Sequence, residues 1–289
     1  MLKRINLNIK LFKNYLKASC GGVFGIAAAG LLFLDKNDLG IDTTCKEIGA
    51  LVALLAVAFV CAVIGVFAYT TVDSIKDKLT LRYGDLWKIA FSSKGNKKII
   101  VVNVNTTFDT IVDENLSLID KPLVSPITIH GQWIKQMNKR NVSIADIDEG
   151  IENSLRVQKV EPIKIIDRSN KERGKLKCYT RGTIACYEYE NTVFYLLALS
   201  EFDENNNARN SKEELVQTIT KLIDFYDKHG NGLDIYVPLM GTGQSRTGLS
   251  KEESLEVTSS LFRLYKEKIH GCANIIVYSK DRDKVSLGG

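Results

Sequence analysis

The sequence predicts an α/β protein in which an N-terminal helical hairpin precedes a three-layer α/β/α domain. Two apolar runs without a charge, residues 18–34 and 48–72, are each long enough to cross a bilayer core, the first only just. From about Arg82 onward, apolar strands alternate with amphipathic helices. One of these strands leads through a glycine-rich loop, residues 241–248, into a helix. We therefore expect a transmembrane hairpin over residues 1–77 and the α/β domain over residues 78–289.

The net charge of +5 comes from the N-terminus. Five basic residues precede the first acid, Asp35, so the rest of the chain sums to zero: Lys3, Arg4, Lys10, Lys13 and Lys17. This pattern argues against a nucleic-acid partner, which favours a basic domain. The cysteines are scattered without metal-ligand spacing, at positions 20, 45, 61, 178, 186 and 272. They indicate free thiols in a reducing compartment and predict no metal site.

The charges around the two apolar runs predict their orientation. The connecting segment carries four acids against two lysines, whereas both outer flanks are basic. By the positive-inside rule, the protein is a multi-pass protein of the cell (inner) membrane, with both termini and the α/β domain in the cytoplasm. A signal peptide is the alternative for the first run, but residues 31–34 lead directly into charged residues without a cleavage site. Small residues in both runs permit close helix packing: Gly21, Gly22, Gly25, Ala28, Ala29, Ala50, Ala53, Ala58, Ala62 and Gly65.

The elements of the α/β domain follow from hydrophobic period and length. Strands are predicted over residues 99–105, 183–189, 192–200, 234–240 and 274–279, and helices over 131–138, 143–156, 212–229 and 251–269. The helix after the glycine-rich loop begins at Ser250, with Glu253 three residues on, which predicts a capping box. In such sheets ligands bind beyond the carboxyl ends of the strands. This places residues 103–109 and 241–248 at the same rim.

The glycine-rich loop is the strongest functional motif in the chain. A strand that passes through such a loop into a helix aims backbone N–H groups at phosphate, and glycines allow the backbone to approach closely. The residues of this expected anion cradle are Gly241, Thr242, Gly243, Gln244, Ser245, Arg246, Thr247 and Gly248. An ordinary βα turn is the alternative, and Arg246 could equally point to solvent. The loop lacks the lysine of nucleotide triphosphatases, because Leu249 and Ser250 follow it, so ATP hydrolysis is not expected.

These motifs resemble macro domains, which bind ADP-ribose. Residues 84–86 (Gly-Asp-Leu) match the element that opens these domains, residues 99–104 and 194–199 match their strands, and Gly182 with Thr183 precedes the second of these. The resemblance implies that Asp85, next to Leu86, accepts the adenine amino group. A helix-start aspartate explains Asp85 equally well. The triple glycine that follows the first strand in the hydrolases is missing here, so the resemblance implies binding at Asn103 and Asn105 without catalysis.

The combination of two membrane helices with this divergent macro domain is more specific. Together with residues 108–113 (Phe-Asp-Thr-Ile-Val-Asp), Ser125-Pro126 and His130-Gly131, it resembles the membrane-bound effectors of type II Thoeris antiphage systems. The resemblance implies that a TIR-domain protein makes an ADP-ribose-derived signal, such as an amino-acid conjugate. It further implies that the effector forms a homo-oligomer and that membrane integrity is lost in abortive infection. Its ligand contacts would include Asp109, Ser125, His130 and Gly131.

Alternatives remain open at two points. His130 opens a predicted helix beside a glycine, where it could meet phosphate or ribose, but a lone histidine is more often structural. The protein could also be a membrane-tethered ADP-ribosyl hydrolase, or an adaptor that binds ADP-ribosylated proteins. The chain lacks a Cys/His or Ser/His nucleophile motif, so we expect no catalytic residues and no cofactor beyond the ligand.

Overall fold

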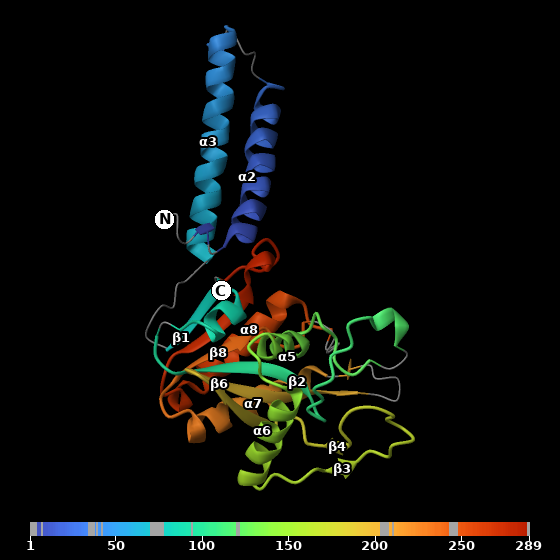
Figure 1. Cartoon of the computed structure of the whole chain (residues 1–289). Helices are drawn as coiled ribbons and strands as arrows, with labels where there is room; N and C mark the ends of the chain where they lie inside the picture. The colour runs from blue at the N-terminus through green and yellow to red at the C-terminus, as the bar shows by residue number, and fades with distance from the viewer. Residues whose placement is uncertain are drawn as a thin grey trace. The chain divides into compact units, whose positions relative to one another are not determined.

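The computed structural model describes residues 5–6, 8–33, 38, 40–41, 43–69, 78–93, 95–119, 122–202, 208–209, 211–242 and 248–287 (Figure 1). The chain divides into two compact units: residues 74–279 form one, and residues 1–73 with 280–289 form the other. The division expected at residue 77 lies outside the described residues. The last ten residues, which we expected in the α/β domain, group with the N-terminal helices instead.

A mainly parallel sheet forms the centre of the larger unit (Figure 1). Its order is β1 (Leu79–Gly84), β9 (Ala273–Tyr278), β8 (Asp234–Pro238), β2 (Lys98–Asn105), β6 (Thr192–Phe202) and β5 (Ile184–Tyr189). The first five of these strands run parallel, whereas β5 and the short β7 (Ala208–Arg209) pair antiparallel with β6. The carboxyl ends of the parallel strands therefore share one rim of the sheet.

Helices cover both faces of this sheet. Successive side chains of β2 point to opposite faces, and nearly all of them are buried, so both faces must be covered. Ile100 and Val102 pack against α4 (Leu86–Ala90), α5 (Ile129–Asn138) and α6 (Ile144–Val157). Ile99 and Val101 pack against α7 (Lys212–His229) and α8 (Lys251–Leu264). The predicted three-layer α/β/α domain is confirmed.

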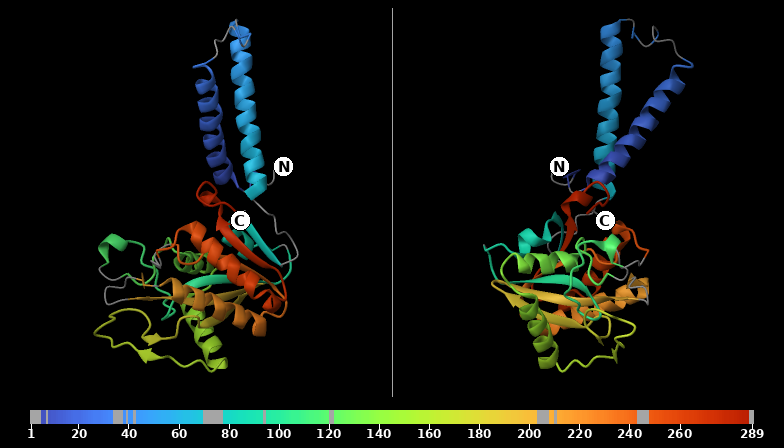
Figure 2. Two further views of the ribbon diagram at one scale, coloured as in Figure 1. Left: turned by 180° about the vertical axis from the view of Figure 1, so that it is seen from behind. Right: turned by 45° about the vertical axis from the view of Figure 1, so that its right-hand side comes forward.

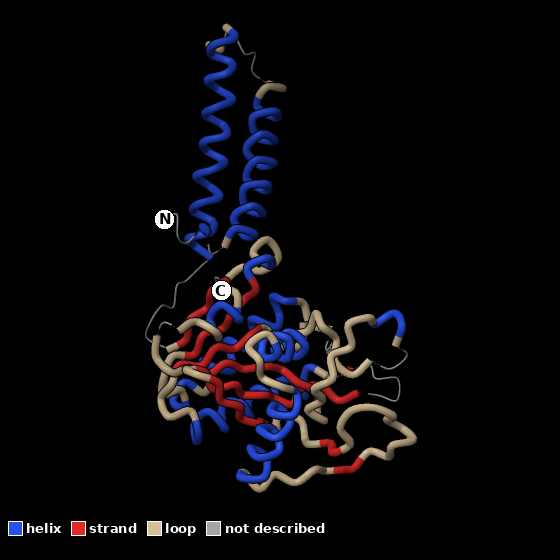
Figure 3. The backbone as a smooth tube through the Cα atoms, viewed as in Figure 1, coloured by secondary structure: helices blue, strands red, loops and turns tan. Residues whose placement is uncertain are grey.

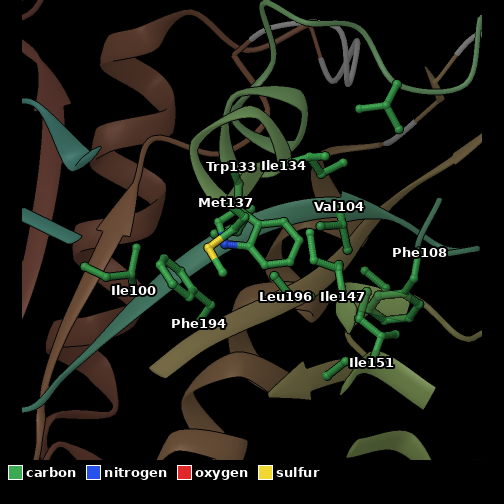
Figure 4. Close-up of a cluster of buried hydrophobic side chains, with 14 of the residues drawn as sticks. Ile100, Val104, Phe108, Trp133, Ile134, Met137, Ile147, Ile151, Phe194 and Leu196 are labelled. Carbon is green, nitrogen blue, oxygen red and sulfur yellow. The ribbon is translucent and has the colours of Figure 1, made fainter. Parts of the chain in front are cut away.

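The core on the α5–α6 face centres on Trp133, which is fully buried (Figure 4). In Figure 4 its ring lies beside Met137 of the same helix, above Leu196 of β6. The ring also packs against Phe194, with centroids 5.8 Å apart. This packing anchors α5, and therefore its first turn, to the middle of the sheet.

Most predicted elements form close to their expected bounds. The helix over residues 212–229 appears as expected, because its apolar face is regular and a Ser211–Glu214 capping box starts it. The capping box predicted at Ser250 and Glu253 is also present. The last predicted helix ends earlier, at Leu264, and a 3₁₀ turn, η2 (Lys266–Lys268), follows it.

Four short strands were not predicted, and one of them is β7 (Ala208–Arg209). β1 pairs only with β9 among the described residues, and its side chains are mostly half-buried, so its pattern lacks a buried strand's apolar run. β3 (Lys164–Ile165) and β4 (Lys177–Cys178) form a two-stranded ribbon in the long segment between α6 and β5 (Figure 3). Most residues of that segment are polar or charged, so the sequence indicates a surface loop there.

The first predicted membrane helix is wrong in its bounds. The helix α2 (Ile9–Gly30) starts nine residues before the apolar run and includes Lys10, Lys13 and Lys17. Within the uncharged run only residues 18–30 are helical, a length of about 20 Å, against a bilayer core of about 30 Å. This uncharged portion is too short to span a bilayer by itself, whereas the whole helix of 22 residues, about 33 Å long, is long enough.

The second helix, α3 (Thr44–Tyr69), was expected over residues 48–72. It begins four residues earlier and ends three residues earlier than expected. Its portion Thr44–Val66 has a mean hydropathy of 2.8 and is long enough to cross a membrane. Among the described residues it is the one helix with both properties. Side chains such as Leu51 and Val60 are about half exposed, which leaves an apolar face uncovered in the chain.

The packing predicted for the small residues of α3 is found at Ala58, Ala62 and Gly65, whereas Ala53 is exposed and Ala50 is half-buried. Ala58, Ala62 and Val66 follow one another at every fourth position and are fully buried. A Cβ added at Gly65 would lie 2.8 Å from the ring of Tyr15, so only glycine fits there. The glycines of α2 do not act this way, because a Cβ at residues 21, 22 or 25 would meet nothing within 4 Å. In the right-hand view of Figure 2 the helices diverge toward the segment that joins them.

The C-terminal segment binds the start of α2. The Lys10 ammonium donates to the carbonyl of Lys284 at 2.9 Å, and Lys13 pairs with Asp283 at 2.9 Å. The N–H of Leu11 in the first helical turn donates to the Ser286 hydroxyl at 3.3 Å. These contacts explain why residues 280–289 group with the hairpin.

Candidate functional site

The predicted site residues that the structure describes gather near the carboxyl rim of the sheet. β2 and β8 run parallel, and their first residues, Lys98 and Asp234, lie opposite each other. The carboxyl ends of the two strands therefore lie at the same edge of the sheet. β1 also ends at this rim, because Gly84 pairs with Tyr278 at the end of β9. Asn103 and Asn105 of β2, Asp85 after β1 and Gly241 after β8 are thus brought to one edge.

The glycine-rich loop is described at its two ends. Gly241 and Gly248 have φ of 79° and 75°, a conformation that favours glycine. Residues 243–247 lie outside the described residues, so the placement of Gly243, Gln244, Ser245, Arg246 and Thr247 stays a prediction. The buried Ser254 hydroxyl donates to the carbonyl of Met240 at 2.6 Å and fixes the entry to the loop against α8. The loop leads into the N-terminus of α8, the positive end of the helix dipole.

Asn103 carries an unsatisfied buried oxygen. Its Oδ1 is shielded from solvent and accepts no hydrogen bond among the described residues. Because side chains alternate along β2, Asn103 faces the α7–α8 side, two residues beyond Val101. An unmatched acceptor of this kind costs about 1–3 kcal/mol. A ligand N–H or O–H at this position would remove that cost.

Asn105 has the opposite environment, although it lies only two residues away. Its Oδ1 accepts the N–H of Asp109 at 2.9 Å, and its Nδ2 donates to Asp109 Oδ2 at 2.9 Å. Thr107 donates to the same oxygen at 2.6 Å. Asn105 is 3% exposed and its side chain holds the loop after β2, whereas its predicted contact with a ligand stays a prediction.

Asp109 is fully buried and is neutralised from a distant segment. The Lys171 ammonium, itself 8% exposed, lies 2.6 Å from Asp109 Oδ2 and also donates to Thr107 and to the carbonyl of Lys175. The N–H of Lys175 donates to Asp109 Oδ1 at 2.7 Å. A buried ion pair is tolerated only when hydrogen bonds satisfy both partners, as they do here. We call these four residues, Asn105, Thr107, Asp109 and Lys171, the Asp109 cluster.

The carboxylate of Asp109 is bound by groups of the protein itself. Its predicted contact with a ligand stays a prediction. Sequence reasoning missed Lys171 because its neighbours are polar and charged, as in a surface loop. Gly174, within the same polar segment, was the one feature of the sequence that could have indicated a close contact there. Its φ is 80°, and a Cβ there would lie 2.3 Å from Asp109 Oδ1.

A second ion pair closes the same loop. Arg173 donates to both oxygens of Asp113 at 2.9 Å, and Asp113 Oδ2 also accepts the N–H of Leu123 at 2.7 Å. Burial alone would raise the pKa of Asp113, but the Arg173 guanidinium and the Leu123 N–H outweigh it and hold the pKa below its usual value. Val112 and Val124 form a parallel bridge beside this pair. The described residues between 106 and 128 are thus tied down at several points.

The start of α5 combines Ser125, Thr128 and Gly131. Thr128 caps the helix: its hydroxyl accepts the Gly131 N–H at 3.1 Å and donates to the carbonyl of Ser125 at 2.7 Å. A Cβ on Gly131 would lie 2.2 Å from that carbonyl, so glycine is required. The Ser125 hydroxyl oxygen is buried and has no hydrogen-bond partner among the described residues. It is a second unsatisfied polar atom among the predicted site residues.

His130 is buried behind this turn. Burial lowers its pKa to about 4, Asp109 opposes the shift through its charge and a backbone hydrogen bond, and Lys175 reinforces it. The ring is therefore neutral at physiological pH and borders the Asp109 cluster. Of the two interpretations of His130, these contacts support the structural one.

Asp85 is the N-cap of α4. Its Oδ1 accepts the N–H groups of Trp87 at 2.9 Å and Lys88 at 3.3 Å, and Leu86 is buried in the core. Asp85 therefore acts as a helix-start residue, the alternative given for it from the sequence. Its predicted contact with the adenine amino group stays a prediction. Within the described part of the chain no group of three or more His, Cys, Asp or Glu residues could hold a metal ion.

This geometry supports binding of a polar ligand at the rim. It presents two buried oxygens without partners, a glycine-rich strand exit and a helix N-terminus. The surrounding loop is held rigid by the Asp109 cluster and by the Arg173–Asp113 pair. A rigid surround lowers the ordering cost of binding.

Known proteins identify the domain. The family model described as "Thoeris protein ThsA, Macro domain" matches residues 79–279. The Thoeris protein ThsA of Bacillus amyloliquefaciens (strain Y2) is 23% identical over 262 residues, covering 86% of this chain and 80% of that protein.

Solved structures show weaker similarity. A macrodomain mutant of Oceanobacillus iheyensis is 11% identical with a TM-score of 0.36, over 71% of this chain and 86% of that one. The structure titled "Alphavirus P23pro-zbd" is 13% identical with a TM-score of 0.38. It aligns with 80% of this chain, which spans only 25% of that chain's length.

The family match extends from the first strand of the sheet to the end of the last one, so it covers the whole described α/β unit. The chain therefore belongs to the Thoeris protein ThsA macro-domain family.

Proposed function

We propose that this protein is a Thoeris antiphage defence effector whose macro domain senses an ADP-ribose-derived signal. A partner protein with a TIR domain makes the signal during infection. Binding at the carboxyl rim of the sheet drives several copies to assemble in the cell membrane. The membrane then loses its integrity, which ends the infection together with the cell.

The observation that carries this proposal is the unsatisfied Oδ1 of Asn103. Most buried polar groups in proteins have a hydrogen-bond partner, so an unpartnered oxygen at the carboxyl rim, where ligands bind in such sheets, supports a partner outside the chain. The ribose hydroxyls and the adenine amino group of ADP-ribose are donors of the required kind. An amide oxygen can accept either of them.

The remaining contacts are assigned by the chemistry of the ligand. The diphosphate lies against residues 241–248 and the N-terminus of α8, where N–H groups and the helix dipole favour an anion. Asp85 and Leu86 contact the adenine, and Ser125 contacts the other end of the ligand. That end carries the group, such as an amino acid, that distinguishes the signal from free ADP-ribose.

The site senses and does not catalyse in this proposal. After Asn105, the last residue of β2, the chain continues with Thr106 and Thr107 where the hydrolases of the fold carry a run of glycines. Here Asn105 is bound to Asp109, so the loop is closed by side-chain contacts.

The membrane part of the proposal rests on α3. Its length, hydropathy and uncovered apolar face fit a bilayer core. α2 accompanies it through the contact at Ala58, Ala62 and Gly65, with its lysines at the cytoplasmic surface. Both termini and the macro domain then lie in the cytoplasm, where the signal is made.

Calorimetry on the full chain in detergent tests the sensing step, with ADP-ribose and its amino-acid conjugates as ligands. We expect at least one of these ligands to bind and to be recovered unchanged after prolonged incubation. Absence of binding by all of them would contradict the proposal. Steady release of a product would instead identify the protein as a hydrolase.

A further inference from the structure

A second cavity lies at the opposite edge of the sheet, far from the carboxyl rim. It has a volume of about 460 Å³ and is bordered by the first residues of β2 and β8, Lys98 and Asp234. The end of α4 and the loop between α4 and β2 complete it. None of the contacts proposed for the ADP-ribose-derived signal involves this cavity.

The main chemical feature of this cavity is the buried ammonium of Lys98. The residue is 6% exposed, and its Nζ makes one long hydrogen bond, 3.3 Å to the carbonyl of Ser92. An ammonium group has three N–H donors, so two remain for other partners. No carboxylate pairs with it among the described residues, although lysines are rarely buried without a counter-charge. Burial accordingly lowers the pKa of Lys98.

Two further lysines border the same cavity. Lys88 is exposed on α4, and Lys97 is exposed and pairs with Glu188 at 2.8 Å. Asp234 is the carboxylate in the lining, and its Oδ1 already accepts the N–H of Cys272 at 2.9 Å. The balance of charge in the lining is therefore positive.

The rest of the wall suits an organic ligand. Ile89, Leu233 and Tyr236 supply apolar surface beside the lysines. Gly95, with φ of 112°, lets the loop before β2 turn, and a Cβ there would meet nothing within 4 Å, so space is open above it. Ligand sites commonly combine an apolar wall with a few polar groups of this kind.

We propose that this cavity is a second binding site, which takes a small phosphorylated metabolite. Lys98 lies at the base of the site and binds the phosphate through its two available N–H donors. Lys88 lies at the mouth and adds positive charge. Phosphate is favoured over a carboxylate because Lys98 and Lys88 both line the cavity, and a phosphate dianion can accept from several ammonium groups at once.

The full chain in detergent tests the proposal, with inorganic phosphate and pyrophosphate as probes and acetate as the carboxylate comparison. We expect millimolar phosphate or pyrophosphate to raise the melting temperature more than acetate at matched ionic strength, since a ligand that binds only the folded state stabilises it. Lys98→Met should lose most of this rise, keeping only the part due to phosphate bound at the carboxyl rim, while melting no lower than the wild type in phosphate-free buffer. Removal of an uncompensated buried charge explains the second expectation.

Two further variants complete the design. Lys88→Met, at the exposed mouth, should weaken phosphate binding several-fold without a change in basal melting. Lys164→Met is the control, because Lys164 is an exposed lysine that pairs with Glu201 at 2.7 Å and lies outside the cavity. It should leave the phosphate effect intact.

Three outcomes would overturn the second site. They are a wild type that does not respond to phosphate or pyrophosphate, a Lys98→Met variant that responds as strongly as the wild type, and a Lys164→Met variant that loses the response. Binding of ADP-ribose conjugates should be unchanged in Lys98→Met. The second site and the sensing rim can therefore fail separately.

Discussion

At the scale of single residues, two asparagines on one strand illustrate how burial assigns different roles to the same side chain. Asn103 has a buried oxygen with no partner, whereas the amide of Asn105 is bound at both ends to Asp109. The sequence pattern treats them alike, as polar residues at a strand end. Only the register and the position of the following loop separate them.

Replacing each asparagine with leucine tests this difference. Asn103→Leu should not lower the free energy of unfolding and should raise it by up to about 1–3 kcal/mol, because it removes an unsatisfied buried acceptor and keeps the volume. Asn105→Leu should cost about 3 kcal/mol, since it removes one hydrogen bond to the buried Asp109 carboxylate and leaves the buried Asp109 N–H without its acceptor. Urea unfolding of both variants measures the costs. Equal costs would show that the two environments are not distinct.

His130 predicts a pH dependence of stability. Its pKa is about 4 in the folded protein and 6.5 in the unfolded chain, so the unfolded state binds more protons between these values. The wild type should therefore lose about 3 kcal/mol of stability as the pH falls from 6.5 to 4. His130→Gln should lack this component, and the difference between the two unfolding profiles isolates it from the titration of carboxylates. Parallel profiles would mean that His130 is not buried as described.

At the scale of elements, the segment between β3 and β4 stabilises the loop after β2. Lys171 and the N–H of Lys175 supply the charge and hydrogen bonds that Asp109 needs. Arg173 does the same for Asp113. A polar segment with little regular structure thereby fixes the loop beside the proposed ligand site.

Gly174→Ala tests that dependence. The new Cβ would meet Asp109 Oδ1 at 2.3 Å, and alanine is strained at a φ of 80°, so we expect a loss of about 3 kcal/mol or more. Gly232→Ala is the matched control. Gly232 has a φ of 70° but open space, and the substitution should cost only about 1 kcal/mol. Similar melting temperatures for the two variants would argue against the contact.

The elements differed in how well they could be predicted, for physical reasons. The helix Lys212–His229 was predicted because a regular apolar stripe and a capping box specify it locally. β1 was missed because a half-buried edge strand has no comparable pattern. The start of α2 was placed nine residues late because lysines were taken as its flank, although lysine is a good helix former.

The candidate site, like the fold, could be predicted from the sequence only in part. The glycine-rich strand exit and the polar end of β2 were visible because both are local patterns at strand ends. The Asp109 cluster was not, because its lysine is 62 residues away in the sequence. No local rule predicts that pairing.

At the scale of the whole molecule, the proposal assigns the helices to the membrane and the α/β unit to the cytoplasm. The topology is testable with single-cysteine variants in intact cells. Cys45, which is exposed near the start of α3, should react with an impermeant thiol reagent from outside. Cys272, which is exposed in the macro domain, should react only after the membrane is permeabilised. Protection of Cys45 from outside would reject the orientation.

The central claim is that a ligand bound at the rim of the macro domain makes the helices disrupt a membrane. The most direct measurement is dye leakage from liposomes that carry the full chain, with and without ADP-ribose-derived ligands. We predict leakage only when a ligand that binds is present, and none with Asn103→Leu at equal protein content. Leakage that is independent of ligand, or that persists unchanged in Asn103→Leu, would contradict the account.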